Sequence, residues 1–165
     1  MKKLIYFLAA LILIVNNAGC SGYNPIYSKD KIEFYIAGFE INGNKKIGKQ
    51  IYSRLNNSSS RSENKSEKKN IYIAINVSKN KVPTVKDGAG KILEYKINLN
   101  TSIEVKDFLT KDEIFTQTFS LSSSYRVQEQ YSETMKLENK SIENLLDKTY
   151  QDILLQLSRN IITKL

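Results

Sequence analysis

The clearest pattern in the sequence is an alternation of apolar and polar residues over eleven positions, which is typical of a β-strand with one buried face. It comprises Tyr95, Ile97, Leu99, Thr101, Ile103 and Val105. Two further runs also predict strands: Ile71, Ile73, Ile75 and Val77 before it, and Phe115, Phe119, Leu121, Tyr125 and Val127 after it. Residues 79–91 are expected to connect the first two strands, and residues 107–112 to turn the chain before the third. Short turns favour antiparallel neighbours, so the sequence predicts a largely antiparallel sheet.

The rest of the chain adds one strand and two helices. Residues 32–41 are rich in β-branched and aromatic residues and predict a first strand. Asn44 can cap a helix that runs to about Leu55. From Ser141 a longer helix is expected, whose apolar face is formed by Ile142, Leu145, Leu146, Tyr150, Ile153, Leu157 and Ile161. The order β-α-β-β-β-α predicts an α+β fold, a two-layer sandwich in which two helices cover one face of a mostly antiparallel four-stranded sheet.

Such a fold leaves the other face of the sheet open. We expect that face to be polar and uncharged, because the last strand carries small hydroxyl residues at alternate positions: Thr116, Thr118, Ser120, Ser122 and Ser124. Residues 56–70 contain no aliphatic or aromatic side chain and predict a flexible polar loop after the first helix.

The first 19 residues have the pattern of a secretory signal peptide. Lys2 and Lys3 precede an apolar run from residue 4 to residue 15. As a helix this run would be only about 18 Å long, too short to cross a hydrocarbon core of about 30 Å. We therefore exclude residues 1–19 from the fold, assign residues 20–31 to a tether and residues 32–165 to a single domain.

The residues that end the signal peptide, Ala18 and Gly19 followed by Cys20, resemble the lipobox of bacterial lipoproteins. The resemblance implies cleavage before Cys20 and attachment of lipid to its thiol, which would become the membrane anchor of the mature protein. The alternative is an ordinary signal peptide that leaves Cys20 as a free thiol. An unpaired thiol is unusual in an exported protein, and Cys20 is the only cysteine of the chain.

The composition argues against an enzyme. The chain contains no histidine, which excludes Ser-His-Asp and Cys-His nucleophile systems and zinc sites with histidine ligands. The segment Gly88-Ala-Gly90-Lys91 lacks the glycine at position 85 and the hydroxyl residue at position 92 that a phosphate-binding loop requires, so it is interpreted as a turn. We expect no cofactor and no metal.

The basic character of the chain points to an anionic surface rather than to nucleic acid. Removing the signal peptide leaves 23 basic and 17 acidic residues, a net charge of +6. An exported protein rarely meets nucleic acid, so a membrane or glycolipid surface is the expected partner of a basic patch. The predicted connection between the first two long strands concentrates four lysines with a single acidic residue: Lys79, Lys81, Lys86 and Lys91.

Several segments together resemble the LPS-assembly lipoprotein LptE family. They are Cys20-Ser-Gly-Tyr-Asn-Pro-Ile-Tyr27 at the lipidated end, Ile47-Gly-Lys-Gln-Ile-Tyr-Ser-Arg-Leu55 in the first helix, Val85-Lys-Asp-Gly-Ala-Gly-Lys91 and Ser124-Tyr-Arg126. The long final helix completes the order of elements. The resemblance spans the mature chain by pattern and element order.

This resemblance implies an outer-membrane lipoprotein that plugs and helps to assemble the LptD β-barrel, supporting transport of lipopolysaccharide to the cell surface. The partners would be the barrel, lipopolysaccharide and, through Cys20, the membrane. Ser21 after the lipidated cysteine is compatible with outer-membrane sorting. The four lysines become candidate contacts to lipopolysaccharide phosphates, with Lys136 and Lys140 as the next candidates, and the alternative for the four is a solvated turn.

Two other functions remain open from the sequence. The chain could be a different periplasm-facing lipoprotein that acts as a binding module or envelope scaffold. It could also be a lipid-anchored enzyme, which would have to work with carboxylates alone.

Overall fold

The computed structural model describes residues 34–59 and 69–162, which belong to one compact unit. The signal peptide, Cys20 and the tether lie outside the described residues. The elements follow in the order β1 (Phe34–Gly43), α2 (Lys45–Ser59), β2 (Lys69–Lys86), β3 (Ile92–Asp107), β4 (Glu113–Arg126) and α3 (Tyr131–Ile162). This order and the α+β class are as predicted.

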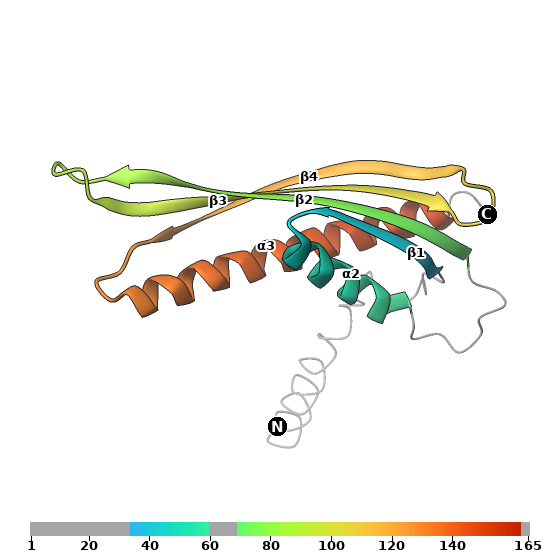
Figure 1. The fold of residues 1–165 in the computed structure, drawn as a ribbon, viewed down its shortest axis with the longest axis horizontal. Coiled ribbons are helices and arrows are strands. Elements are labelled where there is room, and N and C mark those ends of the chain that lie inside the picture. The colour runs from blue at the N-terminus through green and yellow to red at the C-terminus, as the bar shows by residue number, and fades with distance from the viewer. Residues whose placement is uncertain (1–33, 60–68, 163–165) are drawn as a thin grey trace, which may run out of the picture. The chain divides into compact units, whose positions relative to one another are not determined.

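The four strands form a single sheet in which spatial order equals chain order, β1-β2-β3-β4. The pairs β2–β3 and β3–β4 are antiparallel, whereas β1 runs parallel to β2. The parallel pair follows from α2, because a helix between two strands returns the chain to the edge from which it started. Both helices lie on the same side of the sheet (Figure 1).

The core lies between the sheet and the helices. Alternate residues of β2 from Ile71 to Val77, and of β3 from Ile97 to Val105, point into it, and Ile73, Ile75, Ile97 and Ile103 are completely buried there. The helices contribute their own stripes at helical spacing, with Ile51, Leu55, Leu146, Ile153 and Leu157 also inaccessible to solvent. The apolar residues that recur every second position in the strands therefore pack against those that recur about every fourth position in the helices, and together they form one apolar layer.

The predicted connection over residues 79–91 is wrong, because most of it is strand. β2 continues to Lys86 and pairs with β3 from Ile71 with Asp107 up to Lys86 with Ile92. Register shifts on either side of Val85 accommodate Pro83, which cannot donate a backbone hydrogen bond. Only the turn from Asp87 to Lys91 remains, and Gly90 adopts a positive φ of 85° there.

Both helices are longer than predicted. α3 begins at Tyr131 rather than Ser141, and Thr134 Oγ1 accepts a hydrogen bond from the Gln128 amide (2.8 Å) where the chain enters the helix. α2 continues to Ser59, whose hydroxyl donates to the carbonyl of Asn56 (2.8 Å). The predicted loop 56–70 is shorter at both ends, since β2 starts at Lys69; its remaining residues, 60–68, lie outside the described residues.

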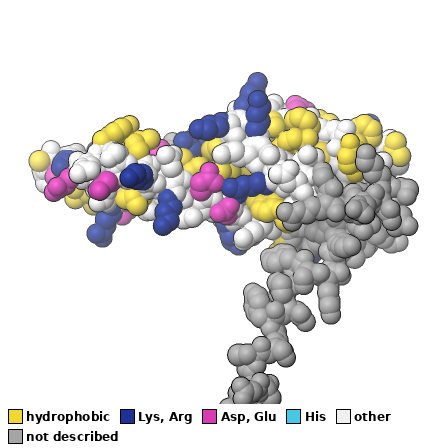
Figure 2. Space-filling view, turned by 90° about the horizontal axis from the view of Figure 1, so that it is seen from below, with side chains coloured by type: hydrophobic (Ala, Val, Ile, Leu, Met, Phe, Trp, Pro, Cys, Tyr) yellow, Lys and Arg dark blue, Asp and Glu magenta, His cyan; other side chains and the backbone are white. Residues whose placement is uncertain are grey.

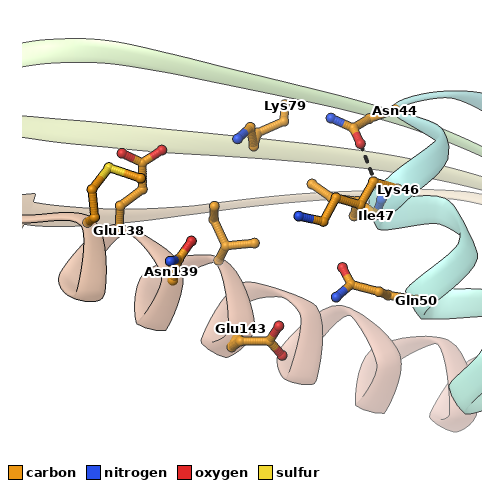
Figure 3. Close-up of a pocket in the computed structure, with 10 residues that line it drawn as sticks. Asn44, Lys46, Ile47, Gln50, Lys79, Glu138, Asn139 and Glu143 are labelled. Atoms are coloured by element: carbon orange, nitrogen blue, oxygen red, sulfur yellow. Dashed lines mark hydrogen bonds between the residues drawn. The ribbon is translucent and has the colours of Figure 1, made fainter. Parts of the chain in front are cut away.

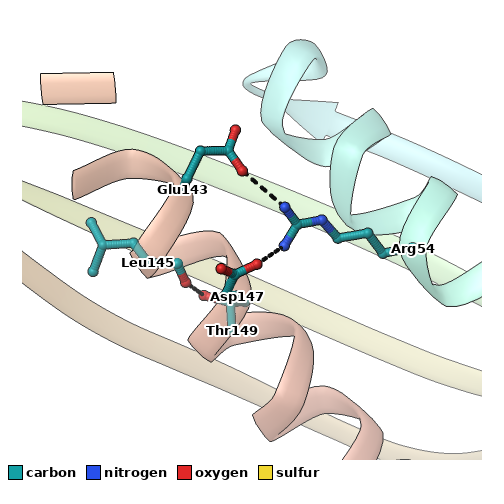
Figure 4. A network of polar contacts seen from close by, with 5 residues as sticks. All are labelled: Arg54, Glu143, Leu145, Asp147 and Thr149. Atoms are coloured by element: carbon teal, nitrogen blue, oxygen red, sulfur yellow. Dashed lines mark hydrogen bonds and ion pairs between the residues drawn. The ribbon is translucent and has the colours of Figure 1, made fainter. Parts of the chain in front are cut away.

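Arg54 links the two helices on their outer side (Figure 4). From α2 its guanidinium donates to Glu143 Oε2 (2.9 Å) and to Asp147 Oδ1, one turn apart on α3. Both carboxylates are about half exposed, so this pair of contacts fixes the orientation of the helices more than it stabilises them.

Two glycines allow α2 to pack closely after β1. Gly43 ends β1 with φ of 73°, and a Cβ there would lie 2.1 Å from the carbonyl oxygen of Val77. That same oxygen accepts the backbone hydrogen bond of Asn44 (2.7 Å), the helix cap. At Gly48 a Cβ would lie 2.5 Å from Ile41 Cγ2, so helix and strand touch at this point.

Thr101 is an anomaly in the core of β3. It is completely buried, and its Oγ1 has no hydrogen-bond partner among the described residues.

Since a buried hydroxyl without a partner is unfavourable, we expect Thr101→Val to stabilise the domain by about 1 kcal/mol. Urea unfolding measures the difference. Thr149→Val is the matched control, because the buried Thr149 hydroxyl donates to the Leu145 carbonyl (2.8 Å) and its removal should bring no such gain. A Thr101 variant that is less stable than the wild type would contradict this assignment.

Candidate functional site

The face of the sheet that points away from the helices is polar across three strands, as predicted for β4. Its middle consists of three rows of directly paired residues: Asn80–Asn98–Ser122, Ser78–Asn100–Ser120 and Asn76–Ser102–Thr118. All nine are uncharged, and those on β2 and β4 are exposed. We call these rows, with Thr116 and Ser124 on β4, the open face.

The composition of the open face suits contact with a polar, uncharged wall. Hydroxyl and amide groups both donate and accept hydrogen bonds, so they adapt to either kind of partner group. Covering them avoids the large desolvation cost of a buried charge. Their small side chains also permit close approach over a wide area. The nearest charges on the strands stand at the margins, where Lys96 and Glu104 occupy the adjoining rows of β3.

The helix side has a different character. Seen from that side, lysine and arginine side chains are interspersed with aspartate and glutamate side chains over the described surface (Figure 2). A mixed-charge surface is typical of a face in contact with water. The open face is therefore the better candidate for a lasting protein contact.

A polar network lies under the far part of the β2–β3 hairpin, on the helix side. Lys81 Nζ donates to Glu138 Oε2 of α3 (2.6 Å), and the Tyr125 hydroxyl donates to the same oxygen (2.7 Å). The ammonium also lies 4.3 Å from the centre of the Tyr95 ring. These contacts hold the first half of α3 against the hairpin, where the sheet offers few apolar side chains.

The network shifts the pKa values of its members. Burial alone would lower the pKa of Lys81, but its hydrogen bonds to Glu138 and Tyr125 outweigh burial and raise that pKa well above the ordinary lysine value. Burial alone would raise the pKa of Glu138, but hydrogen bonds from Lys81 and Tyr125 lower it. Both residues are therefore charged at neutral pH.

Glu138→Gln should destabilise the domain by about 2 kcal/mol at neutral pH, since it removes a buried, charge-assisted contact. The lowered pKa of Glu138 means that its contribution is present above the pKa of the unfolded chain and is lost as pH falls through the folded value. The difference between variant and wild type in urea unfolding should therefore shrink in acid. Glu143→Gln, at the exposed Arg54 contact, should cost less than about 1 kcal/mol. An equal effect of the two variants at neutral pH would contradict the assigned role of Glu138.

The structure does not bring the four predicted lysines together. Lys79 and Lys81 lie on the helix side of β2, and Lys81 is engaged with Glu138. Lys86 ends β2 and Lys91 follows the turn, so these two stand at the hairpin tip. Lys136 and Lys140, predicted to precede the last helix, are exposed residues within α3. Only Lys86 and Lys91 fit the predicted position in a connection.

Lys79 lines a pocket of about 470 Å³ between the start of α2, β2 and α3 (Figure 3). It is lined by apolar side chains, among them Ile47 and Ile142, and by the polar side chains of Lys46, Gln50 and Asn139. Asn44 Oδ1 accepts the amide hydrogen of Ile47 (3.2 Å) and so caps α2 at this edge. The acidic residues of the rim are already engaged, Glu138 with Lys81 and Glu143 with Arg54.

The sequence prediction found the β4 part of the open face but missed the contributions of β2 and β3. The signal was present, because small polar residues alternate with the core residues of both strands. The alignment of these polar residues into rows depends on the pairing register of the strands, which cannot be read from the sequence. The contact of Lys81 with Glu138 was missed because it joins positions far apart in the chain.

Two further observations concern the described residues alone. Neither helix in the ranges 34–59 and 69–162 combines the length and apolar character needed to cross a membrane. The same ranges contain no group of three or more acidic, cysteine or histidine side chains that could hold a metal ion.

Comparison with solved structures shows that the fold occurs in bacterial lipoproteins. An uncharacterized lipoprotein B from Nitrosomonas europaea superposes with a TM-score of 0.56 and 18% identity, over 79% of this chain and 87% of that chain. Rare lipoprotein B from Shewanella oneidensis superposes with a TM-score of 0.55 and 10% identity, over 76% of this chain and 97% of that chain. A candidate lipoprotein from Caulobacter crescentus CB15 superposes with a TM-score of 0.55 and 13% identity, over 77% of this chain and 92% of that chain. No protein-family model and no curated protein sequence matches this chain. At these identities the similarity establishes a shared fold.

Proposed function

We propose that this chain is an outer-membrane lipoprotein, anchored through Cys20, whose open face seats against the inner wall of an LptD-like β-barrel. In this role it helps the barrel to assemble and to deliver lipopolysaccharide to the cell surface. The proposed role is not enzymatic. The observation that carries the proposal is the open face, with three adjoining rows of uncharged hydroxyl and amide side chains.

A barrel lumen matches this face in chemistry. The interior of an outer-membrane barrel is polar, and its wall is itself a sheet of alternating side chains. A surface without charge can be enclosed there with little desolvation cost. The similarity in fold to solved lipoproteins, among them rare lipoprotein B, supports the placement in the envelope, as do Ala18, Gly19 and Cys20, which resemble a lipobox.

In this role Lys86 and Lys91, at the hairpin tip, contact lipopolysaccharide. Arg126 lies beside that tip and lines a pocket with Val85 and Leu93, both partly exposed. Basic groups next to apolar side chains suit a ligand that carries both phosphate and acyl chains. Lys81 does not serve this role because its ammonium is paired with the Glu138 carboxylate.

The test of the proposed function is a double substitution on the open face, Thr118→Arg with Ser122→Arg. Both residues are exposed, so the isolated domain should lose less than about 0.5 kcal/mol of unfolding free energy. Enclosed in a barrel, two unpaired guanidinium groups would each cost several kcal/mol. We therefore expect recovery of the barrel with the tagged lipoprotein to fall at least about tenfold.

The matched control places the same charges on the helix side. Ser132→Arg with Asn144→Arg changes two exposed polar residues of α3 and should leave recovery of the barrel unchanged. If the open-face variant recovers as much barrel as the control, the open face is not the contact surface. That result would favour a lipoprotein that acts as a binding module or envelope scaffold.

A further inference from the structure

One end of the sheet differs from the open face in carrying aromatic and apolar side chains. Tyr35 of β1 pairs with Asn70, two residues before Tyr72 on β2, so both tyrosines lie on the same face of the sheet. Phe108 and Leu109 follow β3 in the turn to β4 at this end. Gly38 makes this cluster possible, since a Cβ there would lie 3.0 Å from the Tyr72 ring and 3.2 Å from the Phe108 ring. We call Tyr35, Tyr72, Phe108 and Leu109 the aromatic end.

Leu109 is the most exposed aliphatic residue among the described large hydrophobic residues, with 76% of its surface accessible; Tyr35 is 42% accessible. An exposed leucine on a mobile loop would not indicate a binding surface, but the β3–β4 turn that carries Leu109 is held by hydrogen bonds. Asp107 Oδ1 accepts hydrogen bonds from the amides of Leu109 (2.9 Å) and Thr110 (3.1 Å). The Phe108 amide donates to the carbonyl of Asn70 in β2 (3.0 Å), which ties the turn to the sheet.

This end of the domain is also where the chain arrives from the lipid anchor. β1 begins at Phe34, paired with Lys69 at the start of β2, and Asp107 pairs with Ile71 two residues further on. The start of β1 and the β3–β4 turn therefore lie at the same end of the sheet (Figure 1). Fourteen steps of chain separate Cys20 from Phe34, a reach of about 50 Å when fully extended.

The opposite end of the sheet lies a strand length away from Phe34, where β1 begins. β2 has 18 residues, which span about 60 Å, and its hairpin tip carries Ala89 between Gly88 and Gly90. The chain therefore enters the domain at the aromatic end, which lies within reach of a bilayer that holds Cys20. The hairpin tip lies about one strand length beyond this point of entry.

From these observations we infer that the aromatic end rests on the bilayer interface as a second membrane contact, with Leu109 inserted among the lipids. This inference rests on the proposed lipid anchor at Cys20 but not on the barrel. Tyrosine is favoured at the interface because its ring is apolar and its hydroxyl polar. Lys111, whose ammonium lies 4.5 Å from the Phe108 ring centre, can extend its charge to the headgroups.

The charges around the aromatic end predict contact without a requirement for anionic lipid. Lys106 pairs with Glu104 (2.7 Å), and Glu40 accepts the Tyr72 hydroxyl (3.0 Å). Carboxylates outnumber lysines at this end by five to three: Glu40, Glu104, Asp107, Asp112 and Glu113 against Lys69, Lys106 and Lys111. Insertion should therefore occur in uncharged phosphatidylcholine and should persist at high salt.

The experiment uses tryptophan as the probe, because the chain contains none. Leu109→Trp is introduced into the full-length protein, which is produced in lipidated form and reconstituted into phosphatidylcholine vesicles with or without brominated acyl chains. Ala89→Trp, in the exposed β2–β3 turn, is the matched control with the same probe. Both positions are exposed, so neither substitution should disturb the fold.

We expect Leu109→Trp emission to shift to shorter wavelength on reconstitution and to be strongly quenched by the brominated lipids. Ala89→Trp should keep the emission of a probe in water and resist quenching. Vesicle-bound protein whose Leu109→Trp emission resembles that of the control would overturn the inference while leaving the anchor intact. Shielding that appears only after a barrel is added would also overturn it, in favour of a protein contact. Protein that does not stay on the vesicles would overturn the anchor at Cys20 and the inference together.

Discussion

Replacing Cys20 by serine is expected to release the protein from the membrane completely. The mature anchor would consist of several acyl chains, each worth about 0.8 kcal/mol per buried methylene, and such anchors do not readily leave the bilayer. Serine offers no thiol for lipid attachment, and Cys20 is the only cysteine in the chain. The Cys20→Ser protein should therefore incorporate no radiolabelled palmitate in the native host and should appear in the soluble fraction.

The control for this experiment is Ser21→Ala, which leaves the thiol in place and should still take up label. The aromatic end alone should not retain the Cys20→Ser protein, because insertion of a few side chains is weak beside that of acyl chains. A Cys20→Ser protein that is still labelled and still sediments with membranes would refute the lipid anchor. It would also remove the premise on which the outer-membrane assignment rests.

Gly43→Ala should destabilise the domain by more than about 3 kcal/mol. A left-handed backbone costs a non-glycine residue about 1–2 kcal/mol, and here the new Cβ would also lie 2.1 Å from a backbone oxygen that cannot move aside easily. That oxygen, of Val77, receives the hydrogen bond of Asn44, so a shift of β2 would also weaken the start of α2. Urea unfolding measures the loss.

Two other glycines distinguish the cost of the left-handed backbone from the cost of the steric contact with Val77. Gly90 has a similar φ of 85° but open space around it, so Gly90→Ala should cost only the backbone term, about 1–2 kcal/mol. Gly88 has neither a positive φ nor a neighbour within 4 Å, and Gly88→Ala should be nearly neutral. The expected order of destabilisation is Gly43, then Gly90, then Gly88. A Gly43→Ala protein that is no less stable than Gly90→Ala would show that the close approach to Val77 is relieved at little cost.

The sequence was sufficient for the class of fold because its two periodicities are local. Alternation marks one buried face per strand, and the stripe of α2 at Ile47, Ile51 and Leu55 marks the helix that covers it. All three of those helical residues are buried in the structure. The parallel pairing of β1 was not foreseen because it depends on the path of the chain through α2, not on the residues of β1.

The extension of the β2–β3 hairpin could not be predicted for a different reason. Beyond Val77 the inward positions of β2 hold Lys79 and Lys81 in place of isoleucine, so the apolar signal ends although the strand continues. Lys81 is accepted there because Glu138, 57 residues away, supplies a carboxylate and Tyr125 a hydroxyl. A partner so distant in the chain is visible only once α3 is in place, and the start of α3 was itself placed ten residues too late.

The placement of α3 at the end of the element order has a consequence for how an exported chain acquires its structure. With strand order equal to chain order, each strand can pair with its predecessor as it emerges. The apolar faces of β3 and β4, however, stay uncovered until the 32 residues of α3 arrive. A chain that is exported amino end first would therefore present the apolar face of β3 and β4 to its surroundings until α3 follows. We expect truncation before Tyr131 to trap this intermediate as an aggregating species.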